Sequence, residues 1–218
     1  MRKLPDMMPE MVTMNTFVVS VEIPDEFLPV LGFSAHMGTP ILYVSRSSIP
    51  ALTKDFFVRD KKRNITIVGT EHTISTQVEQ ELRTLVTGTV ERLDGTNASD
   101  LAIKFSMNQS SQTGMGWGRN RPGMGDAFSF FPADWRYAML SAPLSHTGKH
   151  TPLLPLNSGV FPKEYSAYLE FLKPKGMHPK PPFMHAYLVG DDRHISVRQQ
   201  LMIEKHIAFE ETAEPIME

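Results

Sequence analysis

The sequence contains no cysteine among its 218 residues. Without a thiol the chain can form no disulfide, no thiolate–zinc or iron–sulfur site, no c-type haem attachment and no cysteine nucleophile. A chain without thiols is also indifferent to the redox state of its surroundings, so this absence leaves the compartment open.

The chain also lacks an excess of either charge, because 22 Lys and Arg residues stand against 24 Asp and Glu residues, a formal net charge of −2. Nucleic-acid-binding proteins usually carry a clear basic excess, so we expect no nucleic-acid partner. No apolar run approaches the roughly 18 residues of a membrane span, and we expect no transmembrane segment. The start of the chain, up to Met14, mixes Met with Pro and charged residues, so we also expect no signal peptide in this chain.

The sequence contains an internal repeat. Thr39-Pro-Ile-Leu-Tyr-Val-Ser45 is matched by Thr151-Pro-Leu-Leu-Pro-Leu-Asn157, and a proline follows each at the same spacing, Pro50 and Pro162. These matched positions lie 112 residues apart. Ordered similarity of this kind is the sequence signature of a duplicated unit.

A second match lies further along, between Ile65-Thr-Ile-Val-Gly69 and Ala186-Tyr-Leu-Val-Gly190. Each glycine is followed by four variable residues and then by Ile-Ser, and the offset is now 121 residues. The nine extra residues fall in a Pro- and Lys-rich stretch at 173–184, which indicates an insertion in the second copy. We infer that the fold is written twice.

Each copy alternates short apolar runs with helical patterns, which is typical of parallel strands joined by helical crossovers. The predicted fold class is therefore α/β, with two tandem βαβαβα modules that have small parallel sheets and are related by duplication. The predicted strands are Phe17–Val21, Ile41–Ser45, Ile65–Val68, Val90–Leu93, Phe128–Phe131, Pro152–Leu156 and Ala186–Val189. The predicted helices are Glu26–His36, one starting at Pro50, one capped by Ser75 (or by Thr76 with Glu79), Trp135–Ser145, Pro162–Leu172 and Ser196–His206.

These boundaries divide the chain into five parts. We predict an N-terminal tail at 1–16, a first module at 17–107, a Gly-rich connector at 108–125, a second module at 126–208 with its insertion at 173–184, and an acidic tail at 209–218.

The duplicated motifs resemble the cell wall-binding repeat 2 family, found in proteins of bacterial and some archaeal envelopes. The first copy carries most of the resemblance, in Pro40-Ile-Leu42, Pro50, Ile65–Gly69, Ile74-Ser75 and Val90-Glu-Arg-Leu-Asp-Gly95. It covers about residues 17–107 and 125–208. The resemblance implies α/β repeats, normally three of them, that attach surface proteins noncovalently to anionic wall polymers.

The resemblance also singles out the turn after Val90–Leu93. Arg92 and Gly95 match the family's signature, whereas its second Arg and its Tyr are missing and Asn97 stands in that region. We predict that Arg92, Gly95 and Asn97 either contact a polymer or another anion or fix the junction between repeats. The missing Arg removes a potential contact to an anionic polymer and has less bearing on the fold.

Two segments are candidates for docking a partner. The connector carries Trp117, Arg119 and Arg121, and aromatic and Arg side chains are the types that anchor interfaces. The insertion carries Lys175 and Lys180 among prolines, which present a stiff surface. The connector's glycines do not form a phosphate cradle, because the segment neither follows a strand nor opens a helix with a Gly-Lys-Ser/Thr ending.

Asp191-Asp-Arg-His194 forms the densest polar cluster, directly after a predicted strand. Loops at the carboxyl ends of parallel strands are where α/β sheets bind ligands, so Asp191, Asp192, Arg193 and His194 form a candidate ligand loop. The alternative is a solvated turn whose carboxylate caps the next helix.

The sequence predicts no catalytic, cofactor or metal site. His146 and His150 have i, i+4 spacing, but Gly148 lies between them and no accompanying Glu is present, so a helical two-His metal motif is not expected. There is no Gly-x-Ser-x-Gly elbow for a serine nucleophile.

The leading hypothesis is a non-catalytic extracytoplasmic protein of the cell envelope that binds anionic wall polymer or other envelope proteins. An oligomer or a hetero-complex is compatible with this hypothesis. The first alternative is an accessory subunit of a larger extracytoplasmic complex that has lost polymer binding. The second alternative is a small-molecule-binding α/β enzyme.

Overall fold

The computed structural model describes residues 14–147, 150–174 and 183–209. In this part of the chain seven strands form two separate parallel sheets. The first sheet has the order β2 (Ile41–Val44), β1 (Asn15–Ser20), β3 (Asn64–Val68) and β4 (Val90–Leu93). The second sheet has the order β6 (Leu153–Leu156), β5 (Ala127–Pro132) and β7 (His185–Leu188).

Helices connect consecutive strands, as a parallel sheet requires. They are α2 (Leu28–Met37), α3 (Ala51–Arg59), α4 (Thr76–Leu85), α5 (Ala98–Met107), α6 (Trp135–Ser141), α7 (Lys163–Leu172) and α8 (Val197–Ile207). Two 3-10 turns, η2 (Pro24–Glu26) and η3 (Ala142–Ser145), complete the described elements. The predicted α/β class with two small parallel sheets is confirmed.

Strand pairing in the two sheets repeats at the two sequence offsets, 112 and 121 residues. Phe17 pairs with Ile41 in the first sheet, and Ser129 pairs with Leu153 in the second, so both partners are shifted by 112 residues. Thr66 on β3, the other neighbour of Phe17, corresponds to Tyr187 on β7 at an offset of 121. The two sheets are therefore built on the same plan, and the extra residues enter between α7 and β7.

The helix starts repeat as well. Pro50 and Pro162 stand at the N-caps of α3 and α7, where a missing backbone N–H costs no helical hydrogen bond. Ser75 and Ser196 cap α4 and α8, and each hydroxyl oxygen accepts a hydrogen bond from the backbone N–H three residues on. The alternative start at Thr76 is wrong, because Thr76 is the first residue of the helix itself.

Several strand bounds differ from the prediction by one or two residues, and β1 begins at Asn15, inside the predicted tail at 1–16. Three further differences concern helices. The helix expected at 26–36 begins only at Leu28, after the turn η2, and the one expected at 135–145 ends at Ser141 and continues as η3. Pro143 explains the second change, because its missing N–H interrupts an α-helix. Helix α5 is not among the predicted elements, although Asn97 caps it by accepting a hydrogen bond from the Asp100 N–H at 2.9 Å.

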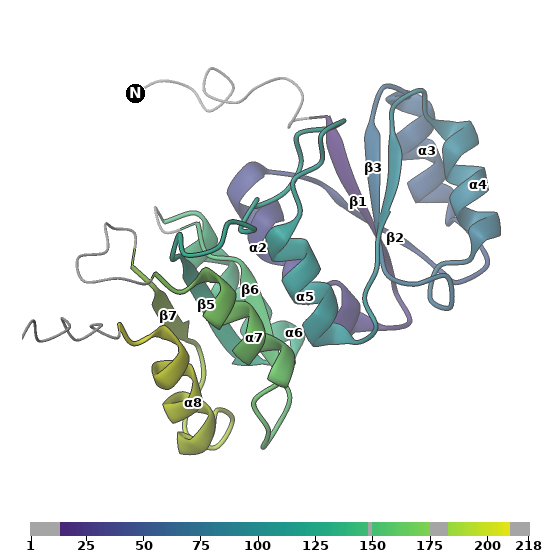
Figure 1. Cartoon of the computed structure of the whole chain (residues 1–218). Coiled ribbons are helices and arrows are strands. Elements are labelled where there is room, and N and C mark those ends of the chain that lie inside the picture. Colours follow the sequence, from purple (N-terminus) through teal and green to yellow (C-terminus); the bar gives the residue numbers. More distant parts are fainter. Residues whose placement is uncertain (1–13, 148–149, 175–182, 210–218) are drawn as a thin grey trace, which may run out of the picture.

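Helices α2 and α5 lie between the two sheets and contribute to both cores (Figure 1). From α2, Phe33 packs in the core of the first sheet and Leu28 in that of the second. From α5, Phe105 packs against the first sheet and Ala102 against the second. The outer face of the first sheet is covered by α3 and α4, so this half has three layers (Figure 1). None of the described helices has both the length and the apolar character needed to cross a bilayer.

Candidate functional site

The Gly-rich connector is held in place by the ends of two helices. The Gly118 N–H donates to Asn108 O at 2.8 Å at the end of α5, and the Gly123 and Gly125 N–H groups donate to Phe171 O and Leu172 O at 3.0 and 2.7 Å at the end of α7. These N–H groups satisfy helix-terminal carbonyls and are not aimed at a phosphate.

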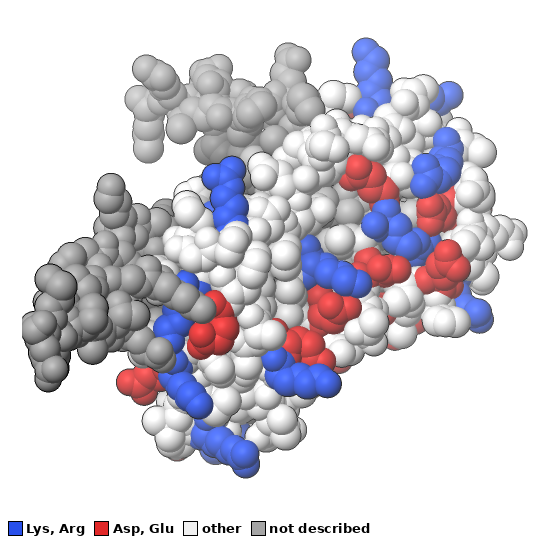
Figure 2. All heavy atoms as spheres, viewed as in Figure 1, with Lys and Arg blue, Asp and Glu red and all other residues white. Residues whose placement is uncertain are grey.

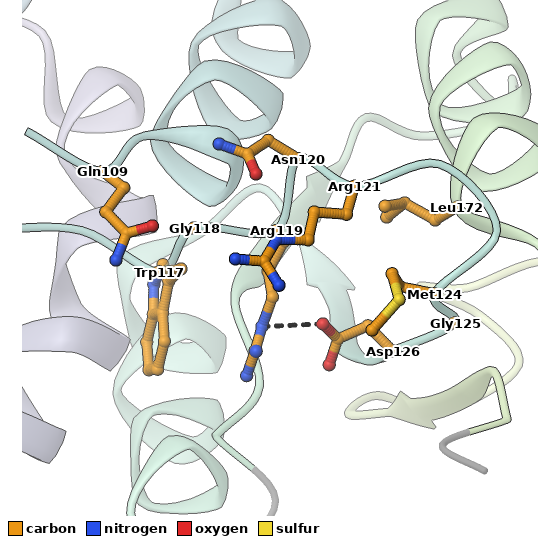
Figure 3. A pocket seen from close by; sticks show the side chains of 10 residues that line it. All are labelled: Gln109, Trp117, Gly118, Arg119, Asn120, Arg121, Met124, Gly125, Asp126 and Leu172. Carbon is orange, nitrogen blue, oxygen red and sulfur yellow. Dashed lines mark ion pairs between the residues drawn. The ribbon is translucent and has the colours of Figure 1, made fainter. Parts of the chain in front are cut away.

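The connector lines a polar cleft of about 280 Å³, which we call the connector cleft. It brings together all three connector residues predicted to dock a partner. Its lining is Gln109, Trp117, Gly118, Arg119, Asn120, Arg121, Met124, Gly125, Asp126 and Leu172 (Figure 3).

Arg119 connects several segments around the connector cleft. Its Nε lies 2.8 Å from Asp126 Oδ2, and its Nη2 donates to His150 O at 3.2 Å (Figure 3). Its backbone carbonyl accepts a hydrogen bond from the Tyr168 hydroxyl at 2.7 Å. Arg119 therefore links the connector to β5, α7 and the loop before β6.

The ion pair leaves one uncompensated cation in the connector cleft. Burial raises the pKa of Asp126, although the Arg119 charge opposes this rise, so the two side chains form a partly desolvated pair. Arg121 is exposed and has no hydrogen bond or ion pair with any described residue. Its free guanidinium, with the amides of Gln109 and Asn120 nearby, suits a carboxylate, a phosphate or a polar neutral group.

Trp117 separates the connector cleft from a second hollow of about 240 Å³. Its ring stacks on His36 at 5.5 Å between centroids and meets Phe33 edge-on at 5.2 Å, so one face of the indole is used inside the molecule. His36 Nε2 lies 3.0 Å from His150 Nδ1, and His146 is also close, with ring centroids 5.8 Å apart.

His36 is neutral at physiological pH. Desolvation lowers its pKa to about 4, and the charges of His150, His146 and Arg119 act in the same direction. Within the described part of the chain, no three His, Asp or Glu side chains are arranged to hold a metal ion. His36 is therefore a neutral, aromatic contact beside the connector.

Arg92 on β4, Gly95 after it and Asn97 before α5 all make structural contacts. Arg92 donates to Glu79 Oε2, Gly69 O and Ile74 O at 2.8–2.9 Å, and its side chain is 12% exposed. A side chain on Gly95 would meet the Leu101 backbone at 2.5 Å, and Asn97 caps α5. Arg92 also lines a polar hollow along β4 of about 500 Å³, separate from the connector cleft.

The predicted ligand loop at 191–194 closes on itself. Asp191 accepts hydrogen bonds from the Arg193 backbone and side chain and pairs with His194 Nδ1, which also lies 3.1 Å from the Tyr137 hydroxyl. These bonds hold the pKa of the Asp191 carboxyl low, at about 2. Asp192 is exposed, and the loop does not join the connector cleft. The other predicted docking residues, Lys175 and Lys180, lie outside the described residues.

Sequence reasoning missed several residues near these sites. The sequence marks Asp126 only as the start of the second module and His36 only as the end of a helix. In the structure Asp126 pairs with Arg119 and His36 stacks on Trp117. Glu26 was also missed: burial raises its pKa, and it lies next to Thr73 and Arg92. The one available signal was the His-x-Gly pattern that is repeated at His36 and His146, whose rings lie 5.8 Å apart between centroids.

The chain is similar in structure to two cell wall proteins of Clostridium difficile. With Cwp6 the TM-score is 0.66 at 15% sequence identity, over 88% of this chain. With Cwp8 the TM-score is 0.62 at 14% identity, over 89% of this chain. At this identity the likeness shows a shared fold.

The chain spans only 27% and 29% of the lengths of Cwp6 and Cwp8. No protein-family model matches the sequence, and no curated protein matches it.

Proposed function

We propose that the chain is a non-catalytic, extracytoplasmic protein of the cell envelope that binds anionic wall polymer through the connector cleft. The observation that carries this proposal is the convergence of Arg119, Arg121 and Trp117 on one cleft in a fold shared with two cell wall proteins. The duplicated motifs that resemble cell wall-binding repeats support the same role.

The chemistry of the cleft fits a single anionic group. Arg119 is neutralised by Asp126, and Arg121 supplies the remaining positive charge. Trp117 offers a flat apolar wall on which a sugar or another ring can stack, and the side-chain amide of Gln109 provides a donor and an acceptor.

The face of the molecule that carries α4, α5 and α7 does not provide a broad basic field. Figure 2 shows Lys and Arg residues interspersed with Asp and Glu over the face that carries α4, α5 and α7. Recognition would therefore depend on contacts at the cleft and less on long-range attraction, and added salt should weaken it only moderately.

Sedimentation with purified cell walls tests the proposal. The full chain should co-sediment with walls at low salt, and Arg121→Glu should weaken apparent binding about tenfold by placing a carboxylate where the polymer's anion would lie. Arg59→Glu is the matched control, because Arg59 is also exposed and unpaired among the described residues but lies on α3. The control should bind as the unmodified protein does.

Two results would contradict polymer binding at this cleft. The first is no co-sedimentation with walls at low salt. The second is equal loss of binding in Arg121→Glu and Arg59→Glu, which would indicate a general charge effect.

A second candidate function is that of an accessory subunit in a larger envelope complex. It is favoured by the outer face of α6, where Trp135, Met139 and Leu140 are 57%, 55% and 66% exposed. Three large apolar side chains on one short helix are costly to leave in water and are typical of a docking face. Purification from the native source decides this candidate, because a subunit should co-purify with a partner and Met139→Lys should release it.

A further inference from the structure

Among the described residues, the second sheet has no counterpart of β4, the fourth strand of the first sheet. In the first sheet β3 lies between β1 and β4, and Ile65 pairs with Val90 while Val68 pairs with Leu93. Its counterpart β7 pairs with β5 on one side, and no described strand pairs with its other side. One edge of β7 is therefore open in the described structure.

The open edge presents backbone donors in the pattern that β4 satisfies in the first sheet. There, the Ile65 and Gly69 N–H groups donate to Thr89 O and Leu93 O at 2.8 and 2.9 Å. Ala186 and Gly190 hold the same positions in the second copy. The N–H groups of the intervening residues point toward β5 instead. Those of His185 and Val189 donate to Asp126 O and Phe130 O.

One apolar side chain of this edge is more exposed than its counterpart, and the neighbouring helix carries exposed apolar residues where the first copy has polar ones. Leu188 is 40% exposed, whereas the corresponding Ile67 is fully buried. On the neighbouring helix α8, Val197 and Leu201 are 63% and 58% exposed, and the first copy has Thr76 and Gln80 at these positions. Phe183, just before β7, is 43% exposed and extends the same surface.

We propose that the open edge of β7 is a docking site for an extended segment of another protein, which adds to the second sheet as a parallel fourth strand. Strand addition of this kind is a common mode of peptide recognition, in which backbone hydrogen bonds give affinity and alternate side chains give specificity. The proposal does not depend on polymer binding at the connector cleft.

The internal repeat shows what the added strand must look like. On β4, Val90 is 6% exposed in the core under α4, and Leu93 packs on the opposite side with Phe33 and Phe105 nearby. The occupant therefore needs apolar residues at its first and fourth positions. The residues of this chain at the corresponding place in the sequence are Glu211 and Glu214. Two carboxylates are unsuited to those sites in this register, and the occupant that we propose is therefore a segment of another protein.

A peptide test uses the strand that the first copy provides. The probe is a synthetic peptide with the sequence of residues 88–96, added to the full chain, and the readout is backbone hydrogen exchange. The amides of Ala186, Leu188 and Gly190 should exchange about tenfold more slowly at saturating peptide. The same peptide carrying Val90→Glu and Leu93→Glu should have no effect.

Protein variants complete the test. Leu188→Lys should abolish the protection, because a lysine on an edge strand opposes strand addition. Leu52→Lys is the matched control, since Leu52 is 84% exposed on α3, and it should leave the protection unchanged. A chain carrying Glu211→Val and Glu214→Leu should protect the same three amides without added peptide, which covers the case of weak binding in solution.

Three outcomes would overturn the proposal. One is unchanged exchange of β7 amides both with the peptide at about 1 mM and in the double variant. Another is equal protection by the Glu-substituted peptide. The third is a dimer of the unmodified chain that Leu188→Lys dissociates, because the edge would then belong to a second copy of this chain.

Discussion

At the scale of single residues, the histidine beside the connector has the clearest consequence. His36 stacks on Trp117 and meets His150 edge-on, and burial and neighbouring positive charge lower its pKa from 6.5 to about 4. The unfolded chain therefore binds a proton at this side chain at a pH where the folded chain does not. The stability linked to His36 is complete above pH 6.5 and falls as the pH drops toward 4.

His36→Gln should remove this pH dependence. Between pH 7 and pH 5 the unmodified chain should lose up to about 2 kcal/mol more unfolding free energy than the variant, because the unfolded state alone gains a proton. Urea unfolding at the two pH values measures the difference. His72→Gln is the control, since His72 is exposed, and it should lose as much as the unmodified chain. Identical pH profiles for His36→Gln and the unmodified chain would contradict the assignment.

Even a conservative substitution of Arg119 should destabilise the protein. Its planar fork reaches both Asp126 and His150 O, and a lysine can replace the charge but not both contacts. We expect Arg119→Lys to lower the unfolding free energy by about 1–2 kcal/mol. Arg136→Lys should have a much smaller effect, because Arg136 is 70% exposed and its ion pair with Asp134 is local. Equal effects in urea unfolding would show that Arg119 is only a surface contact.

At the scale of elements, the connector depends on one glycine more than on the others. Gly116 has φ +129°, and a Cβ there would lie within contact of the Asn108 backbone carbonyl, which cannot move without disturbing the end of α5. Gly123 has φ +71° but open space around it. We expect Gly116→Ala to cost at least about 2 kcal/mol and Gly123→Ala about 1 kcal/mol. Thermal or urea unfolding of the two variants gives the comparison, and a reversed order would contradict it.

The same scale shows what the sequence could and could not predict. Strands and helix starts followed from apolar runs and from Pro50, Pro162, Ser75 and Ser196, because these signals act within a few residues. Helix α5 was not predicted, since two of its faces are apolar for packing on two sheets and the segment has no simple amphipathic stripe.

The candidate site was predicted in part, for a related reason. Trp117, Arg119 and Arg121 stand out by residue type in a short Gly-rich segment, so their selection needed no tertiary knowledge. Asp126 directly follows the connector, but nothing in the sequence marks it as the partner of Arg119. His36 matters only because the fold brings it to Trp117, 81 residues further along the chain. Such contacts depend on long-range packing and leave no local pattern.

At the scale of the whole molecule, the two copies of the repeat pack closely against each other. Helix α2 comes from the first copy, yet a Cβ on Gly32 would lie 2.5 Å from Ser145 Oγ and 2.9 Å from Leu153 Cγ in the second. Tyr168 on α7 also shares a hydrogen bond of 2.8 Å with Ser106 on α5. Because the core of each sheet is completed by α2 and α5, losing one sheet exposes apolar surface of the other.

The two copies should therefore unfold together, and the two tryptophans allow this to be measured. Trp117 packs on the side of the first sheet and Trp135 begins α6 beside the second. In Trp135→Phe and Trp117→Phe, the fluorescence of the remaining indole should change at the same urea concentration as the far-ultraviolet circular dichroism of that variant. Gly32→Val should lower the midpoint seen by both indoles, by about 1–3 kcal/mol in unfolding free energy, because the added methyl groups wedge α2 away from η3 and β6. Separate midpoints for fluorescence and dichroism, or a shift seen by one indole alone, would instead establish two independently folding modules.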